Sequence, residues 1–225
     1  MASPQSSSQA PIGLFGGTFD PVHFGHLRAA LEAREILKLD DFRLLPAGTP
    51  PHRSNTFATA SQRLAMLRLA VVEYSGFRID DREVRRGGNS YMVDTLSEIR
   101  EESSDLPLIL VIGQDAANAL DSWHEWQTIF QLAHLVIMRR PQAEPCWSGE
   151  LQQQMKRRMV QDQERLREQA AGLVLPIEIT QLAISSTGIR NQLQAGRSPR
   201  FLLPAAVMDY IEQNQLYFAG PARKG

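Results

Sequence analysis

The sequence predicts an α/β fold in which helices cover a doubly wound parallel sheet. Short apolar runs rich in β-branched residues alternate with longer segments of helical periodicity, which is the pattern of repeated βαβ units. Gly, Pro or polar residues bound each run, as expected at the ends of strands. With 225 residues, of which 43% are hydrophobic, the chain is long enough to bury one substantial core.

The predicted elements follow in alternation along the chain. We expect strands at Ile12–Phe15, Phe42–Leu45, Phe77–Ile79, Leu108–Ile112, Leu135–Met138 and Val174–Ile179. We expect helices at Gly25–Leu37, Ser61–Tyr74, Val93–Arg100, Glu150–Gln169, Thr187–Gln194 and Pro204–Gln213. The first helix should turn Arg28, Glu32 and Lys38 mostly toward water. The Gln- and charge-rich segment 150–169 is interpreted as a solvated helix, with a subunit or partner surface as the alternative.

One domain is expected over residues 11–219, between a disordered tail at residues 1–10 and a flexible tail at residues 220–225. The 24 Lys and Arg residues nearly balance the 25 Asp and Glu residues, so any anion site must be local, and we expect neither nucleic acid nor a membrane as partner. The single Cys146 excludes an internal disulfide and a multi-cysteine zinc site. The sequence has no signal peptide and no apolar run of about 18 residues, so we expect a cytoplasmic protein.

The segment GGTFDPVHFGH, residues 16–26, links the first strand to the first helix and predicts an anion site. Ligands of open α/β sheets bind where strands end. Gly16 and Gly17 allow the backbone to bend and approach a phosphate, and a helix start offers unpaired N–H groups and a positive dipole. His23 and His26 flank Gly25, and their rings can face one phosphate from the first helical turn.

Two nearby histidines can also be ordinary loop side chains, so the surrounding pattern decides the interpretation. The dinucleotide fingerprint GxGxxG and the P-loop GxxxxGK[ST] are both absent, which argues against a dehydrogenase or a P-loop kinase. Phosphoryl and nucleotidyl transfer depend on positioning and charge neutralisation, which imidazolium N–H groups can supply. The segment therefore indicates transfer chemistry without a protein nucleophile.

A second candidate anion site lies at ISSTGIR, residues 184–190. Ser185 or Ser186 can cap the following helix, whose first-turn N–H groups then face a ligand, although such a cap is often purely structural. Arg190 adds a guanidinium that can bind phosphate oxygens in a bidentate manner. Elsewhere, Trp126 fits a buried helical face, and His134 and Cys146 are interpreted as structural residues.

The sequence resembles the HxGH nucleotidyltransferase superfamily, and in particular the bacterial nicotinate-nucleotide adenylyltransferases. The resemblance rests on GGTFDPVHFGHL and continues through PPHR at 50–53, SYMVDTL at 90–96, IGQDAANALDSWHEW at 112–126, HLVIMRRP at 134–141 and ISSTGIR. It implies a Rossmann-like domain of the nucleotidyltransferase type. It also implies adenylyl transfer from ATP to nicotinate mononucleotide, which gives deamido-NAD and pyrophosphate.

The resemblance also assigns roles to individual residues. The residues implied in catalysis are His23, His26 and Arg190. Those implied in ATP binding are Gly16, Gly17, Thr18, Gly25, Gly113, Asp115, Ser185, Ser186 and Thr187. Those implied in mononucleotide binding are Phe19, Asp20, His52, Arg53, Tyr91, Met92, Trp123 and His124. Asp115 would contact a ribose or cap the helix that follows it. Arg53 would bind the mononucleotide phosphate, and Trp123 would stack on the pyridine ring. Asp20 would orient a histidine or contact the substrate.

One position departs from the family pattern. A Thr commonly follows the Tyr that matches Tyr91, and its hydroxyl helps to hold the nicotinate carboxylate, whereas this chain has Met92. The change makes the discrimination against nicotinamide less strict, and nicotinate mononucleotide remains the preferred acceptor. The alternatives are a related enzyme that uses nicotinamide mononucleotide or phosphopantetheine and, in another class, a nucleotide sensor that lacks catalysis. Mg²⁺ is expected to arrive with ATP, because the sequence offers no carboxylate cluster for a protein-held cation.

Overall fold

The computed structural model describes residues 10–50, 56–103, 105–139 and 145–218. The predicted tails therefore lie outside the described residues, except for Ala10. The chain divides into two compact units. Unit 1 consists of Met1–Phe15, Ala33–Arg43 and Met92–Glu178, and unit 2 of Gly16–Glu32, Leu44–Tyr91 and Ile179–Gly225.

A six-stranded sheet has the order β3-β2-β1-β4-β5-β6. In chain order its strands are β1 Ile12–Gly17, β2 Asp41–Pro46, β3 Arg78–Ile79, β4 Leu108–Gly113, β5 His134–Arg139 and β6 Val174–Glu178. The β1–β4, β4–β5 and β5–β6 pairs are parallel. The order 3-2-1-4-5-6 runs outward in both directions from β1 and β4, as in a doubly wound sheet, and this confirms the predicted fold class.

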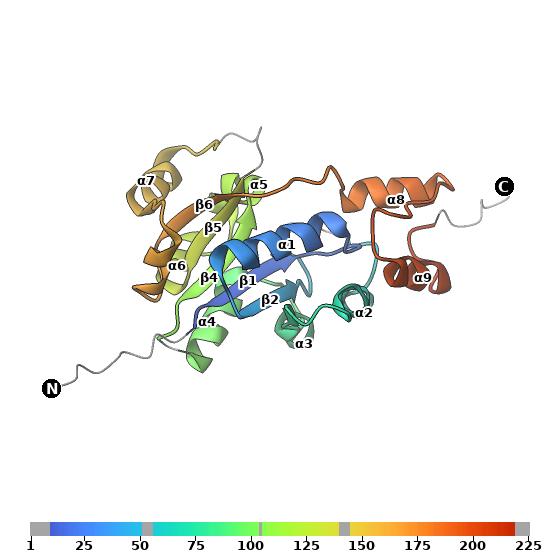
Figure 1. Ribbon diagram of the computed structural model, residues 1–225, viewed down its shortest axis with the longest axis horizontal. Helices are drawn as coiled ribbons and strands as arrows, with labels where there is room; N and C mark the ends of the chain where they lie inside the picture. The colour runs from blue at the N-terminus through green and yellow to red at the C-terminus, as the bar shows by residue number, and fades with distance from the viewer. Residues whose placement is uncertain (1–9, 51–55, 104, 140–144, 219–225) are drawn as a thin grey trace. The chain divides into compact units, whose positions relative to one another are not determined.

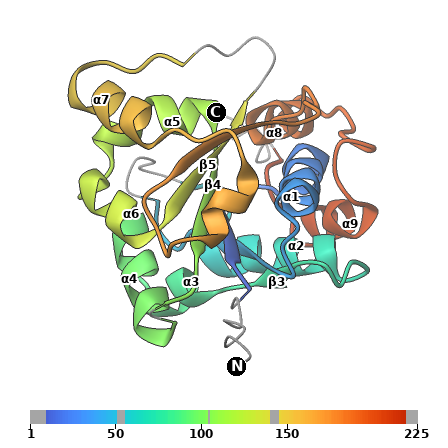
Figure 2. The same cartoon turned by 60° about the vertical axis from the view of Figure 1, so that its left-hand side comes forward.

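Unit 1 is built on the almost continuously buried strands β4 and β5. Its helices are α4 Met92–Glu102, α5 Gln114–Asn118, η1 Leu120–Ser122, α6 Trp126–Leu132, α7 Gly149–Arg158 and η2 Gln163–Arg167. Figure 2 shows α4 beside α6, and the two helices are in contact. Arg100 on α4 donates to the carbonyl oxygens of Leu106, Leu132 and Ala170, and so joins the end of α6 to two loops of unit 1.

Unit 2 contains helices from the first half of the chain and from its last part. They are α2 Ala60–Val71, α3 Arg82–Arg86, α8 Ser186–Gln194 and α9 Ala205–Gln213, together with most of α1 Phe24–Leu37. Thr59 and Gln62 form a capping box at the start of α2, because each side chain bonds the backbone of the other residue. Figure 1 shows α2 beside α9, with which it packs.

The prediction of one helix over Glu150–Gln169 was wrong. Helix α7 ends at Arg158, Met159 is extended, and only a 3-10 turn follows at η2. Met159 forms a bridge with Val174, and the Val160 N–H donates to the Val174 carbonyl. Pairing with the start of β6 therefore takes the place of a continued helix.

The prediction that Glu32 faces water was also wrong. Glu32 is 9% exposed and accepts hydrogen bonds from Arg28 Nε and the Thr180 N–H. These donors hold the pKa of Glu32 below its usual value against the opposing effect of burial. In the part of the chain that the structure describes, no helix has both the length and the apolar character needed to cross a membrane.

Candidate active site

The turn between β1 and α1 lies in unit 2 and brings the two histidines together. Strand β1 continues through Gly16 and Gly17, two residues beyond the predicted end, and the Gly17 carbonyl accepts from the Ala47 N–H. Helix α1 begins at Phe24, and the His23 carbonyl accepts from the N–H groups of His26 and Leu27. His23 therefore immediately precedes the helix, whereas His26 lies in its first turn, which corrects the expectation that both project from that turn.

The imidazole rings of His23 and His26 stack on each other, with centroids 3.7 Å apart and planes inclined by 25°. The His23 N–H donates to Nδ1 of His26 over 3.3 Å. A neutral His26 must then carry its proton on Nε2, and it can donate from that atom to an oxyanion. A Cβ atom at Gly25 would lie 3.0 Å from Nδ1 and Cε1 of His23, so the stacked pair needs a glycine between the histidines.

His23 is neutral in the structure at physiological pH. Its side chain is only 4% exposed, and burial lowers its pKa from 6.5 to about 4. Its Nδ1 atom is buried and has no hydrogen-bond partner among the described residues. A buried polar atom without a partner typically costs about 1–3 kcal/mol, and an incoming phosphate oxygen is one group that could satisfy it.

Phe19 packs against this histidine pair through His26. It is 2% exposed, and the edge of its ring meets His26 with centroids 5.1 Å apart. A Cβ atom on Gly17 would lie 2.8 Å from the Phe19 ring, so the second glycine makes room for that ring. The structure thus gives Phe19 a packing role, and its predicted contact with substrate stays a prediction. The Thr18 side chain is half-buried, and its carbonyl is engaged by Arg63.

Helix α8 supplies the second predicted anion site, and it also lies in unit 2. Ser185 is the residue that caps it, since its Oγ accepts from the Gly188 N–H over 3.1 Å. Ser186 Oγ donates to the Pro21 carbonyl over 2.9 Å. This bond ties the first turn of α8 to the HxGH turn, so the two predicted anion sites belong to one local structure.

Arg190 is held at the inner face of α8 and is 8% exposed. Its Nη1 donates to the Asp20 carbonyl over 2.6 Å, and its Nη2 donates to Thr187 Oγ1 over 3.1 Å. The guanidinium carbon lies 4.5 Å from the centre of the Phe57 ring, as in a cation–π contact. Its Nε is buried and has no partner among the described residues. Arg190 is therefore a fixed cation with donor capacity to spare.

Asp20 does not orient a histidine through any contact seen in the structure. Its carboxylate is 3% exposed and accepts from the N–H groups of Phe57 and Ala58 and from the hydroxyl of Tyr217. These contacts are internal to unit 2, so the structure assigns Asp20 an anchoring role. A direct contact between Asp20 and substrate stays a prediction.

No sequence pattern indicates the role of Arg63, which is the largest fully buried side chain of the described residues. Its guanidinium donates to the carbonyls of Thr18, Ala47 and Gly48 over 2.6–2.8 Å, and Nε reaches the Ala58 carbonyl at 3.4 Å. Burial lowers its pKa, although nearby Asp20 opposes the shift. Arg63 thus binds together the ends of β1 and β2 and the start of α2.

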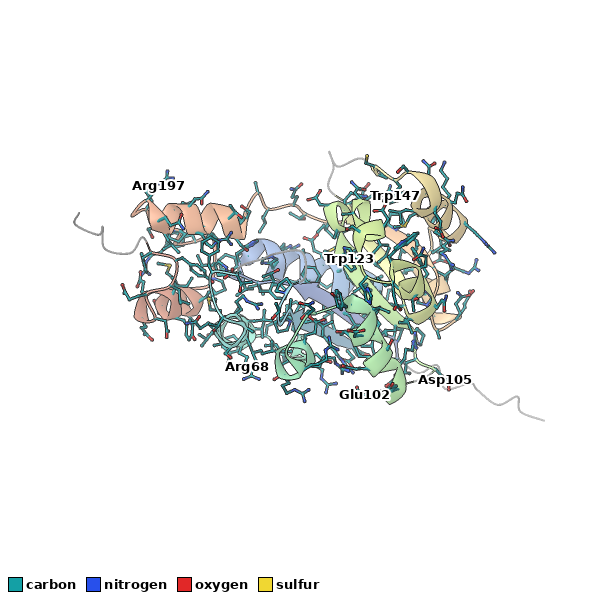
Figure 3. All side chains as sticks on the ribbon, turned by 180° about the vertical axis from the view of Figure 1, so that it is seen from behind. Arg68, Glu102, Asp105, Trp123, Trp147 and Arg197 are labelled. Atoms are coloured by element: carbon teal, nitrogen blue, oxygen red, sulfur yellow. The ribbon has the colours of Figure 1, made fainter. Side chains whose placement is uncertain are left out.

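Unit 1 carries the residues predicted to bind the nucleoside and the pyridine ring. Gly113, rather than Asp115, precedes α5, so Asp115 is an exposed residue in the first turn of that helix. Trp123, labelled in Figure 3, is half-buried after η1, and His124 is exposed. Trp126 is 9% exposed and meets the Phe130 ring edge to face, which confirms its core position.

Four further residues were predicted to bind substrate: Tyr91, Met92, His52 and Arg53. Tyr91 and Met92 are both half-buried, and the Tyr91 hydroxyl accepts from Asn89 Nδ2 over 3.1 Å. His52 and Arg53 lie outside the described residues.

His134, in unit 1, has both ring nitrogens bonded to backbone, Nε2 to the Gln169 carbonyl and Nδ1 to the Leu173 N–H. This bonding confirms its structural interpretation.

Comparisons with known proteins show which family the chain is similar to. The family model described as cytidylyltransferase-like matches residues 14–192. A chain of Methylococcus capsulatus, named as a probable nicotinate-nucleotide adenylyltransferase, is 49% identical over 92% of this chain and 99% of its own length. A chain of the same name from Aeromonas salmonicida is 46% identical over 94% of this chain and 99% of its own length.

Solved structures show the same fold at low sequence identity. The nicotinic acid mononucleotide adenylyltransferase of Plasmodium falciparum, complexed with NaAD, superimposes with a TM-score of 0.71. It is 17% identical, and the match covers 93% of this chain and 98% of that one. A second structure of that enzyme, complexed with APC, has a TM-score of 0.68 at the same identity and coverage.

Proposed function

The chain belongs to the nicotinate-nucleotide adenylyltransferase family within the cytidylyltransferase-like proteins, and from that premise we propose that it adenylates nicotinate mononucleotide. ATP donates the adenylyl group, and the products are deamido-NAD and pyrophosphate, as in NAD biosynthesis. The observation that carries the proposal is that two polar atoms of unit 2, His23 Nδ1 just before α1 and Arg190 Nε in α8, are buried without partners among the described residues. The hydrogen bonds from Ser186 to Pro21 and from Arg190 to Asp20 join the two segments. A polyphosphate offers acceptors for these groups.

In the proposed reaction, a phosphate oxygen of the mononucleotide attacks the α-phosphorus of ATP in line. The bond from that phosphorus to the oxygen bridging the α- and β-phosphates breaks, and pyrophosphate leaves with the bond electrons. Negative charge therefore builds on the oxygens around the α-phosphorus and on the leaving group. His26, through Nε2–H, and His23 would donate to the first set, and Arg190 would bind the second.

The two histidines would act as hydrogen-bond donors and not as bases, because the attacking phosphate is already ionised at neutral pH. Bound phosphate charge also favours the protonated form of His23, since an anion nearby raises the pKa of an imidazole. We therefore expect His23 to take up a proton when ATP binds. It would then carry its positive charge only when the phosphates are present.

Other residues of the site are assigned by family resemblance. We propose that Asp115 binds a ribose, that Trp123 stacks on the pyridine ring, and that backbone N–H groups around Met92 and His124 recognise the carboxylate. Mg²⁺ would arrive with ATP, held mainly by phosphates and water. Among the described residues, no three His, Cys, Asp or Glu side chains cluster closely enough to hold a metal ion. We also propose a cytoplasmic location for the protein.

Pyrophosphate release on mixing the protein with Mg-ATP and nicotinate mononucleotide tests the proposal directly. The His26→Ala variant should lower kcat by roughly 100-fold, or about 3 kcal/mol, as loss of one charge-stabilising donor typically does. Wild-type protein that binds ATP without releasing pyrophosphate would indicate a nucleotide sensor. Turnover of His26→Ala within about threefold of wild type would show that the histidine role is misassigned.

The acceptor is tested by comparing nicotinate mononucleotide, nicotinamide mononucleotide and phosphopantetheine under identical conditions. A site that pairs with the carboxylate should give a kcat/KM at least about 100-fold higher for the acid than for the amide. Equal values for the acid and the amide would refute the assigned substrate while leaving adenylyl transfer intact.

A further inference from the structure

The Tyr217 phenol and the Asp20 carboxylate form a buried pair, and Asp20 also contacts Arg190 through its backbone carbonyl. The Tyr217 hydroxyl donates to Oδ1 of Asp20 over 2.6 Å. Tyr217 is 7% exposed and Asp20 is 3% exposed, so water hardly competes for this bond. Burial, and then the Asp20 carboxylate, raise the pKa of Tyr217, and the hydroxyl therefore stays a donor throughout the working pH range.

The backbone around Tyr217 adopts a disfavoured conformation. After α9 ends, Gln215 and Tyr217 both adopt positive φ values, 50° and 66°. This left-handed conformation is disfavoured for residues with a side chain, and a bulky aromatic residue rarely adopts it. Two such residues in three positions turn the chain sharply, and the hydroxyl bond to Asp20 is one interaction that this turn makes possible.

Asp20 in turn supports Arg190 in two independent ways. Its backbone carbonyl accepts from Arg190 Nη1 over 2.6 Å. Its carboxylate accepts from the Phe57 N–H over 2.9 Å, and the ring of Phe57 packs against the Arg190 guanidinium with the carbon 4.5 Å from the ring centre. The position of Asp20 therefore determines both the hydrogen bond at the edge of the guanidinium and the aromatic ring against its face.

We propose that Tyr217 is a positioning residue for adenylyl transfer, which acts through Asp20 to fix the direction in which the Arg190 guanidinium presents its remaining N–H groups. The inference rests on the proposed function of Arg190 as a ligand of the ATP phosphates. Tyr217 itself touches no substrate. Its role is to make Arg190 rigid before ATP arrives, so that less conformational freedom is lost on binding.

The test uses Tyr217→Phe, which keeps the buried ring and removes only the hydroxyl. Tyr210→Phe in α9 is the matched control, because it removes the same hydroxyl from a half-buried ring outside the Asp20–Arg190 contacts. Calorimetry with Mg-ATP alone gives the affinity for the nucleotide. Steady-state kinetics give kcat and the separate KM values for ATP and nicotinate mononucleotide.

We expect Tyr217→Phe to weaken ATP binding about tenfold and to lower kcat by a similar factor, within the range of coupling between contacting residues. KM for nicotinate mononucleotide and all constants of Tyr210→Phe should stay within about twofold of wild type. A variant that was merely less stable would lose active protein but keep the affinity and KM of the folded fraction, so the ATP affinity separates the two explanations.

A double-mutant cycle with Arg190→Ala decides whether Tyr217 acts through Arg190. If it does, the Tyr217→Phe substitution changes ATP affinity less than about twofold once Arg190 has been removed. The same loss in both backgrounds, or ATP binding at wild-type strength in Tyr217→Phe, would overturn the proposal. If Tyr217→Phe does not fold, Asp20→Asn carried through the same cycle takes its place, with the same two outcomes. The binding cycle does not depend on turnover, so failure of the proposed reaction would be seen separately, as absence of pyrophosphate.

Discussion

His23 makes the stability of the protein depend on pH in a way that one substitution can isolate. The folded chain holds this imidazole neutral, with a pKa near 4, whereas an unfolded chain exposes it with the ordinary value of 6.5. Between these two values the unfolded chain binds a proton that the folded chain does not bind. Stability contributed by neutral His23 is therefore complete above pH 6.5, falls as the pH drops from 6.5 toward 4, and changes little below pH 4.

The size of the effect follows from the two pKa values. A tenfold change in proton affinity corresponds to about 1.4 kcal/mol, so a fall from 6.5 to about 4 makes the full loss of stability about 3 kcal/mol. At pH 4.5 most of this loss, about 2.5 kcal/mol, should already be present. Removing the imidazole in His23→Gln should abolish this part of the pH dependence, because glutamine does not titrate.

Urea unfolding at pH 7.5 and pH 4.5, for wild type and for His23→Gln, measures this contribution. Other groups that titrate, including His134 and the carboxylates, affect both proteins equally and cancel in the comparison. The free energy of unfolding of wild type should fall by about 2.5 kcal/mol more than that of the variant. An equal fall in both proteins would refute the reasoning that burial keeps His23 neutral.

Three further predictions concern residues around the site. Gly25→Ala should lower kcat at least about tenfold, because the added methyl group would press on the His23 ring 3.0 Å away. The unfolding free energy should change by less than about 1 kcal/mol, because alanine favours the helix. Wild-type kinetics in this variant would contradict the prediction. Arg63→Met should lower the unfolding free energy, measured in urea, by about 3–5 kcal/mol, because it leaves buried carbonyls without donors. A loss below about 1 kcal/mol would be inconsistent with the central role of this side chain. Met92→Thr restores a hydroxyl donor and should raise the ratio of kcat/KM for acid over amide mononucleotide about tenfold; an unchanged ratio would show that the hydroxyl is not what selects the acid.

The fold class and the location of the turn between β1 and α1 could be predicted from sequence because their signals are local. An apolar run such as 108–112 is buried wherever the sheet lies, and a Gly-Gly turn between a strand and a helix identifies its own neighbours. The end of β1 was placed too early for the same reason. Gly16 and Gly17 suggest a turn locally, but the bond from the Ala47 N–H extends the strand.

Arg63 shows what local patterns cannot reveal. Its place in an amphipathic helix looks ordinary, since arginine on such a helix usually faces water. Its burial depends on carbonyls from three other segments of unit 2, those after β1, after β2 and before α2. Glu32 and Tyr217 are similar cases, because Thr180 and Asp20 lie 148 and 197 positions away in the sequence. A polar residue whose partner lies that far along the chain carries no signal in its own neighbourhood.

The two cationic side chains of the proposed site, His23 and Arg190, differ in their charge before ATP binds, which limits the repulsion between them. The Arg190 guanidinium is held by a carbonyl, a hydroxyl and an aromatic face. Burial keeps His23 neutral, so the proposed site has one cation fewer before ATP binds. Bound phosphates would favour the protonated form of His23, because a nearby anion stabilises the imidazolium. The positive charge that the transition state requires would then be drawn from solvent as a proton, and ATP affinity should rise as the pH falls toward the His23 pKa of about 4.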